Sequence, residues 1–194
     1  MDRETRKYWQ AQRRHMLKRD RRQRINFGQD MVVTKILIGL MVLSYLVETF
    51  VPGLMAALYA HPGGIVLSYL LSALSPGGFI GLLFAGFFLW IIGSQIEGLT
   101  TWWQYLVIFF ASGVIGAFAA GVLGGGSIGG TFASFGLAGA YVMVMASRRV
   151  EGATQWAILL LGINVVLSGF QPGVLGGMLA AFFVGLILSR VMRI

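Results

Sequence analysis

The sequence predicts an all-α fold: a polytopic membrane protein with a six-transmembrane-helix bundle and both termini cytoplasmic. Three observations predict it: the composition, the placement of charge and the length of the apolar runs. Of 194 residues, 57% are hydrophobic and 11% are charged, whereas a soluble domain has about 25% charged residues. The 28 glycines and 14 phenylalanines are typical of packed membrane helices. This composition excludes a disordered chain and a soluble enzyme with a polar surface.

Positive charge is confined to three parts of the chain, which has a net charge of +8. Ten of the 15 Lys and Arg residues precede residue 25, and the other five are Lys35, Arg148, Arg149, Arg190 and Arg193. Lys and Arg mark the cytoplasmic side of a membrane protein. All three basic clusters fit one topology, in which the N-terminus, the connection near Arg148 and the C-terminus are inside. Short loops and this topology favour a bacterial plasma membrane.

Each apolar run is judged against the length of about 20 residues that a helix needs to cross a bilayer. The six runs of that length are Val32 to Val51, Gly78 to Ile96, Thr101 to Leu123, Gly130 to Ser147, Ala153 to Phe170 and Val174 to Met192. We therefore expect a basic cytoplasmic tail over 1–30 and a membrane domain over 31–194.

The connection at 52–76, between the first two spans, is itself apolar and carries Pro and Gly at both ends. Its two short runs, Leu54 to Ala60 and Ile65 to Leu74, are too short to cross a bilayer. We expect interfacial or re-entrant helices in the outer leaflet.

Polar groups that could do chemistry are sparse. Cys is absent, and the two histidines, His15 and His61, lie outside the predicted spans. Glu48, Glu97 and Glu151 do not share a helical face at one depth, so neither a metal site nor a proton relay is expected. We expect no cofactor. The G-x-S-x-G match around Ser127 lies between two predicted spans and has no placed histidine, so we interpret it as a chance match.

Small residues recur at four-residue spacing in two predicted helices. Gly129 with Ala133, and Gly130 with Ser134, mark one face of the fourth. Gly176 with Ala180, and Gly177 with Ala181, mark one face of the sixth. Because such faces let backbones approach closely, we expect the fourth and sixth helices to touch.

Several sequence strings, taken with the six-helix topology, resemble the rhomboid family of intramembrane serine proteases. Leu89-Trp90-Ile91-Ile92-Gly93 followed by Glu97 is similar to the family's LWIFG-x-x-x-E. Phe135-Gly136-Leu137 with Gly139 is similar to the FGLxG after its catalytic serine, and Leu175-Gly176-Gly177 to the LGG after its catalytic histidine. Asn164 to Pro172 resembles the run that enters the family's sixth helix. The resemblance covers roughly residues 32 to 192.

The resemblance also implies that the catalytic positions are degenerate. Thr131 occupies the position of the nucleophilic serine, and Phe132 replaces the glycine after it. Val174 replaces the histidine base, Gly81 another histidine, and Ala85 the asparagine of the oxyanion hole. Hydrolysis needs an activated nucleophile, a base and oxyanion donors, and these positions supply neither base nor donor side chains.

We therefore expect a non-catalytic rhomboid-like protein that binds transmembrane segments of client or partner membrane proteins. Two alternatives stay open. One is an active protease with an atypical site, which would use Thr131, Ser127 or Ser134 with His61 as base. The other is a small transporter or structural membrane subunit. The lipid bilayer is the expected partner in every case, with anionic lipids contacting the basic tail, and no nucleic acid is expected.

Overall fold

The computed structural model describes residues 31–51, 53, 64–125, 129–148, 171–192 and 194, and also residues 155, 159, 162 and 163. Three of the expected features therefore lie outside the described residues: the basic tail, the short run Leu54 to Ala60 and most of the predicted helix Ala153 to Phe170. Residues Val33–Ile194 form one compact unit.

Five helices of the described chain are long and apolar enough to cross a membrane. They are α2 (Val32–Phe50), the continuous helix of α5 (Phe79–Phe88), η1 (Leu89–Gly93) and α6 (Ser94–Glu97), then α7 (Trp102–Val122), α8 (Gly129–Ser147) and α10 (Pro172–Val191). Their bounds differ from the predicted ones by at most two residues. The all-α class and five membrane spans are thus confirmed, and the chain is a multi-pass membrane protein by helix length and composition.

Glycine and proline set the helix ends. Gly77 and Gly78 have positive φ angles of 69° and 132° immediately before α5, a conformation that side chains disfavour. Gly124, with φ 71°, follows the end of α7. The next N–H, of Gly125, donates to the Ala120 carbonyl at 2.8 Å, which closes the helix as a Schellman motif. Pro172 occupies the first turn of α10, where its missing N–H costs nothing.

The bundle has two ends. At one end, the Glu97 end, lie Glu97 and the beginning of α2; at the other, the Gly78 end, lie Gly78 and the beginning of α8. The short helix α4 (Gly64–Ser72) and the turn after it lie at the Gly78 end. There the Gly130 N–H donates to the Ser75 carbonyl at 2.9 Å, so the turn satisfies one of the free N–H groups of α8. α4 overlaps the expected short run Ile65 to Leu74 and begins one residue before it. Its expected place in the outer leaflet stays a prediction.

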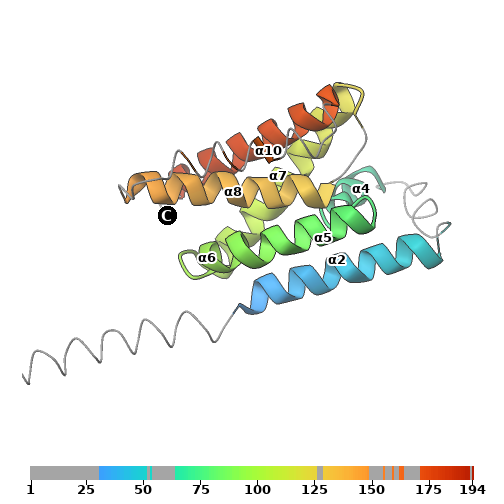
Figure 1. Cartoon of the computed structure of the whole chain (residues 1–194), viewed down its shortest axis with the longest axis horizontal. Helices are drawn as coiled ribbons and strands as arrows, with labels where there is room; N and C mark the ends of the chain where they lie inside the picture. Colours follow the sequence, from blue (N-terminus) through green and yellow to red (C-terminus); the bar gives the residue numbers. More distant parts are fainter. Residues whose placement is uncertain are drawn as a thin grey trace, which may run out of the picture. The chain divides into compact units, whose positions relative to one another are not determined.

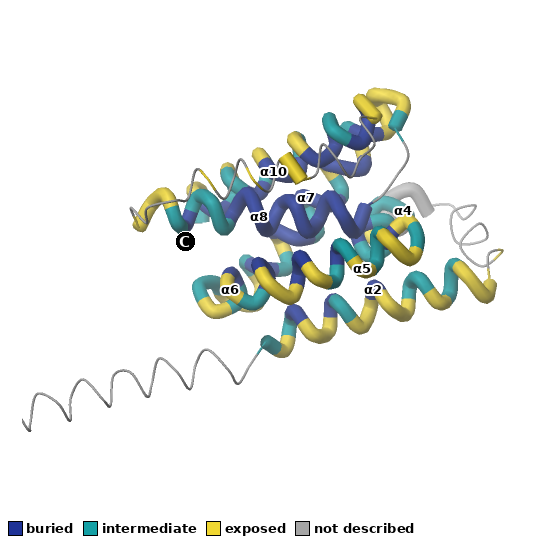
Figure 2. Tube along the Cα trace, in the orientation of Figure 1, coloured by how far each residue is buried: buried dark blue, intermediate teal, exposed yellow. Residues whose placement is uncertain are grey.

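α8 is the central helix, and it is buried on all sides along its first twelve residues, Gly129 to Ala140 (Figure 2). Glycine makes this burial possible. A Cβ atom on Gly139 would overlap the Phe182 carbonyl oxygen of α10, and one on Gly136 would overlap the Ser112 side chain of α7. The neighbouring helices therefore pack directly against the α8 backbone.

The same contacts fix the helix directions. Along α8, Phe132, Gly136 and Gly139 meet successively later residues of α10, so the two helices run parallel. Along α7 the order is reversed, since Phe132 faces Gly116 and Gly136 faces Ser112. Figure 1 shows α8 and α10 side by side, with α7 crossing behind α8. Because α8 and α10 are parallel, the last residue of α8 and the first residue of α10 lie at opposite ends of the bundle.

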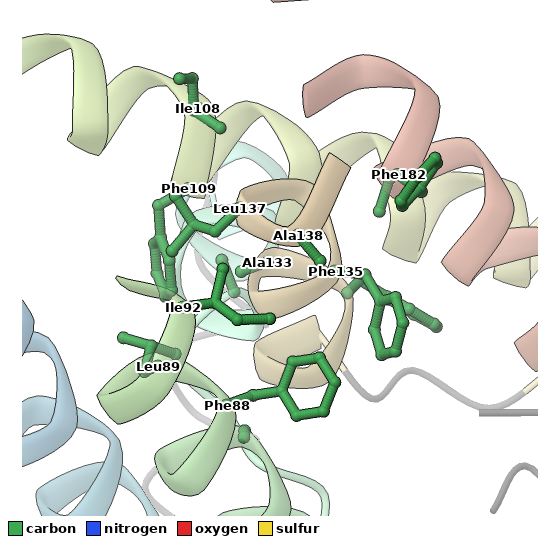
Figure 3. Close-up of a cluster of buried hydrophobic side chains, with 14 of the residues drawn as sticks. Phe88, Leu89, Ile92, Ile108, Phe109, Ala133, Phe135, Leu137, Ala138 and Phe182 are labelled. Atoms are coloured by element: carbon green, nitrogen blue, oxygen red, sulfur yellow. The ribbon is translucent and has the colours of Figure 1, made fainter. Parts of the chain in front are cut away.

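A cluster of apolar side chains surrounds α8 (Figure 3). It draws on η1, α5, α7, α8 and α10, and its labelled members include Phe88, Ile92, Phe109, Leu137 and Phe182. The rings of Phe88 and Phe135 are 5.5 Å apart between centroids, which joins α5 to α8. Apart from the Tyr105 hydroxyl, the side chains of the cluster are apolar, so van der Waals packing holds them together.

The expected contact between the fourth and sixth helices is confirmed, although only some of the expected residues make it. Gly177 packs against Phe132 of α8 and against α7, and Ala181 lies near Gly116 and Gly136. Gly129 and Gly130 instead meet the backbone of Ser72 and Ser75, in and after α4. The four-residue spacing indicated close packing but not which partner each small residue meets.

This packing predicts that Gly185→Ala in α10 destabilises the protein, because the new Cβ would overlap the Gly136 carbonyl of α8. Overpacking of this kind costs about 1–3 kcal/mol. The measurement is thermal unfolding of purified protein in detergent. Gly39→Ala in α2 is the matched control, since nothing lies within 4 Å of its added Cβ. Equal melting temperatures for the two variants would contradict the packing described here.

Candidate functional site

The four positions that the resemblance relates to protease chemistry lie at the same end of the bundle. Thr131 and Val174 are each the third residue of their helix, α8 and α10, and Gly81 is the third residue of α5. Ala85 follows one turn later in α5. Since α5, α8 and α10 all begin at the Gly78 end, the structure gathers the four positions there.

Thr131 brings a hydroxyl to this region, but no described side chain there activates it. The residue is 8% exposed, and no described side chain or carbonyl forms a hydrogen bond with its hydroxyl. The next residue, Phe132, is fully buried and fills the space against Gly116 and Gly177. A nucleophile needs a base within hydrogen-bond reach, and the described surroundings of Thr131 do not provide one.

The other three positions present only apolar atoms. Val174 is 2% exposed and lies beside Gly125, where the turn after α7 touches the backbone of α10. Ala85 is 1% exposed within the apolar cluster. A Cβ on Gly81 would overlap the Pro76 carbonyl oxygen, so this backbone leaves no room for any side chain at that position. Each of the three positions is therefore packed against its own neighbours and offers no polar side-chain atom.

Two further serines in the bundle could be considered as nucleophiles. The Ser134 hydroxyl donates to the Gly130 carbonyl at 2.9 Å, the usual bond of a serine to the preceding helical turn. Ser112 is fully buried in α7 against Gly136, and its hydroxyl has no hydrogen-bond partner among the described residues. Neither serine faces a described base. Ser127 and both histidines lie outside the described residues.

The strongest polar constellation lies at the opposite end of the bundle, around Glu97. Its carboxylate accepts hydrogen bonds from the Val33 N–H at 2.8 Å, the Thr34 N–H at 2.9 Å and the Thr34 hydroxyl at 2.6 Å. The Thr34 hydroxyl is also 3.1 Å from the Tyr105 hydroxyl of α7. Glu97 therefore caps the N-terminus of α2, where free N–H groups and the helix dipole favour a negative charge.

The π-helical turn η1 changes the direction in which Glu97 projects from its helix. Residues of an α-helix advance by about 100° each, so in a regular helix Glu97 would lie about 120° around from Ala85. A π turn accommodates one extra residue, which brings Glu97 back by about 100° towards the side of Ala85. Consistent with this, Ile96 is fully buried and Glu97 is half-buried beside it. Gly93, in the π turn, lies directly under the Tyr105 hydroxyl.

The sequence predicts Glu97 at the end of the second span, but it does not predict the contacts of Glu97 with α2 or the neighbouring Tyr105. Thr34 and Tyr105 are separated from it in sequence by 63 and 8 residues, and nothing in the sequence pattern pairs them. One signal was available: Thr34 is a hydroxyl residue in the first turn of α2. Such a residue marks a helix start that needs hydrogen-bond acceptors.

The described basic residues gather at the Glu97 end. Lys35 lies in the first turn of α2, Arg148 follows the last residue of α8, and Arg190 lies in the last turn of α10. Trp102 and Trp103 begin α7 at this end and are 67% and 47% exposed. Tryptophan beside basic residues is typical of a membrane–water interface.

Among the described residues, no group of three His, Cys, Asp or Glu side chains could hold a metal ion. Comparisons with protein-family models, with curated proteins and with solved structures find no match for this chain.

The cap predicts that Glu97→Ala destabilises the protein, because two backbone N–H groups and the Thr34 hydroxyl lose their acceptor. We expect a loss of about 2 kcal/mol, or roughly 4–8 °C in Tm for a chain of this size. Thermal unfolding in detergent measures it. Gln95→Ala, two residues before Glu97, is the matched control. It removes an exposed hydrogen bond that the Tyr141 hydroxyl donates to Gln95. If both variants lost the same amount, Glu97 would have no special part in holding α2.

Proposed function

We propose that this chain is a rhomboid-like membrane protein without protease activity, which binds transmembrane segments of client or partner membrane proteins. One observation carries the proposal: the positions that the resemblance relates to catalysis lie at the same end of the bundle, yet Val174, Gly81 and Ala85 there are packed and apolar. An active site would have to keep polar groups within the membrane at a considerable free-energy cost. A binding scaffold has no such requirement.

The central packing supports a binding role. α7, α8 and α10 form a tight core through glycine contacts, while α2 and α5 present large apolar side chains outwards. Lipid covers such surfaces, and a partner helix can replace lipid at little cost because both are apolar. The tight core would hold these outer surfaces in a fixed arrangement.

The proposal includes an orientation. With the Glu97 end in the cytoplasm, Lys35, Arg148 and Arg190 all satisfy the positive-inside rule. The short helix α4 and the Gly78 end of the bundle would then face the opposite side. The basic tail over 1–30 would lie on the cytoplasmic leaflet, where anionic lipids attract Lys and Arg. We place the protein in a bacterial plasma membrane on the same grounds.

The absence of catalysis is tested with a fluorophosphonate probe for serine hydrolases in native membranes. We expect no adduct, because no described base activates Thr131 or Ser134. An active rhomboid protease labelled in parallel is the positive control. A stoichiometric adduct that disappears in a Thr131→Ala or Ser134→Ala variant would show that the protein is an enzyme and would end this proposal.

The binding role is tested by site-specific photo-crosslinking in native membranes. A photoreactive residue is placed singly at an exposed apolar position of four helices: Leu43 in α2, Leu83 in α5, Phe118 in α7 and Phe183 in α10. We expect discrete adducts with membrane-spanning proteins from one or two adjacent helices. The remaining positions serve as matched controls for random collision. Similar diffuse adducts from all four, or none from any, would argue against a binding surface.

A further inference from the structure

Among the described residues, the hydrogen bonds and buried contacts of α2 with the bundle are concentrated at one end. At the Glu97 end it is held by the hydrogen bonds of Val33 and Thr34 to Glu97. Its buried residues are Thr34, Leu37 and Met41, all within its first ten positions. From residue 42 to the end of α2 at Phe50, no residue is buried, and Figure 2 shows this half as exposed or intermediate.

The side of α5 that faces α2 shows the same asymmetry. Phe79 and Gly86 are spaced by seven residues, nearly two helical turns, and so lie along one stripe of α5. Gly93, in the π turn, lies against the Glu97 end of α2, since a Cβ on it would lie 3.4 Å from the Thr34 hydroxyl. By contrast, nothing lies within 4 Å of a Cβ on Gly86. At the Gly78 end the Phe79 and Tyr45 rings lie 6.3 Å apart between centroids.

The burial along α2 and the contacts along α5 agree: the two helices touch closely at the Glu97 end, and there is open space beside Gly86. Within a membrane, apolar surface gains no hydrophobic free energy by leaving lipid for protein, so hydrogen bonds and close packing hold helices together. For α2 both are concentrated at the Glu97 end. In its other half, the Tyr45 ring contacts the Phe79 ring of α5.

We propose that α2 is a hinged helix, which pivots near Thr34 on the Glu97 cap and swings its Gly78-end half away from α5. Leu46 lies twelve residues beyond Thr34, or about 18 Å along the helix, so a tilt of about 15° moves it by about 5 Å. The opening starts at the free space beside Gly86. This inference does not rest on the proposed function, because the motion needs no partner.

The hinge is tested by pulsed electron paramagnetic resonance on doubly spin-labelled protein in lipid nanodiscs. The chain contains no Cys, so labels attach only at the introduced cysteines. One pair, Leu46→Cys with Leu83→Cys, reports on the Gly78-end halves of α2 and α5. The second pair, Ile36→Cys with Ile91→Cys, reports on the Glu97 end. All four residues are exposed, so the labels displace no core side chain.

We expect a narrow distance distribution for the Glu97-end pair, and for the other pair a distribution that extends at least about 5 Å further. Equally narrow distributions for both pairs would overturn the hinge. Adding Glu97→Ala should broaden the Glu97-end pair as well, whereas adding Gln95→Ala should not, because the Gln95 hydrogen bond leads to α8. If Glu97→Ala does not fold, the comparison of the two pairs in the otherwise unchanged chain still decides the question.

Discussion

The close approach of α8 to the backbones of α7 and α10 is the constraint on which the rest of the structure depends. Gly185 lies against the backbone of Gly136, and Gly139 lies against the Phe182 carbonyl, with no room for a Cβ atom at either glycine. In lipid, where apolar side chains gain nothing by association alone, such contacts supply the packing energy. They also fix the parallel course of α8 and α10, and with it the end of the bundle at which Thr131 and Val174 lie.

The bundle separates two kinds of helix attachment. α7, α8 and α10 are joined by backbone-level packing along much of their length, whereas α2 is joined through the Glu97 cap and three buried side chains. The polar cap is therefore worth more to α2 than any single hydrogen bond in the core is to α8.

Much of the fold could be predicted from the sequence. Helix length and apolar composition are local properties, so the bounds of α2, α5 to α6, α7, α8 and α10 were predicted to within two residues. For the candidate site, the sequence placed Thr131, Val174, Gly81 and Ala85 near helix starts, but only by resemblance did it suggest that they share one region. Their burial, and the overlap that any side chain at Gly81 would make with Pro76, follow from contacts between segments distant in the sequence.

The sequence by itself determined the membrane class, the number of residues in each described span and the grouping of basic residues, because hydropathy and charge act along the chain. Only the tertiary structure decided which glycine meets which neighbour, and that Glu97 caps α2 beside Tyr105. The π turn η1 shows why. Its extra residue rotates Glu97 towards a partner 63 positions away, and a local pattern that reads as one regular helix does not reveal such a rotation.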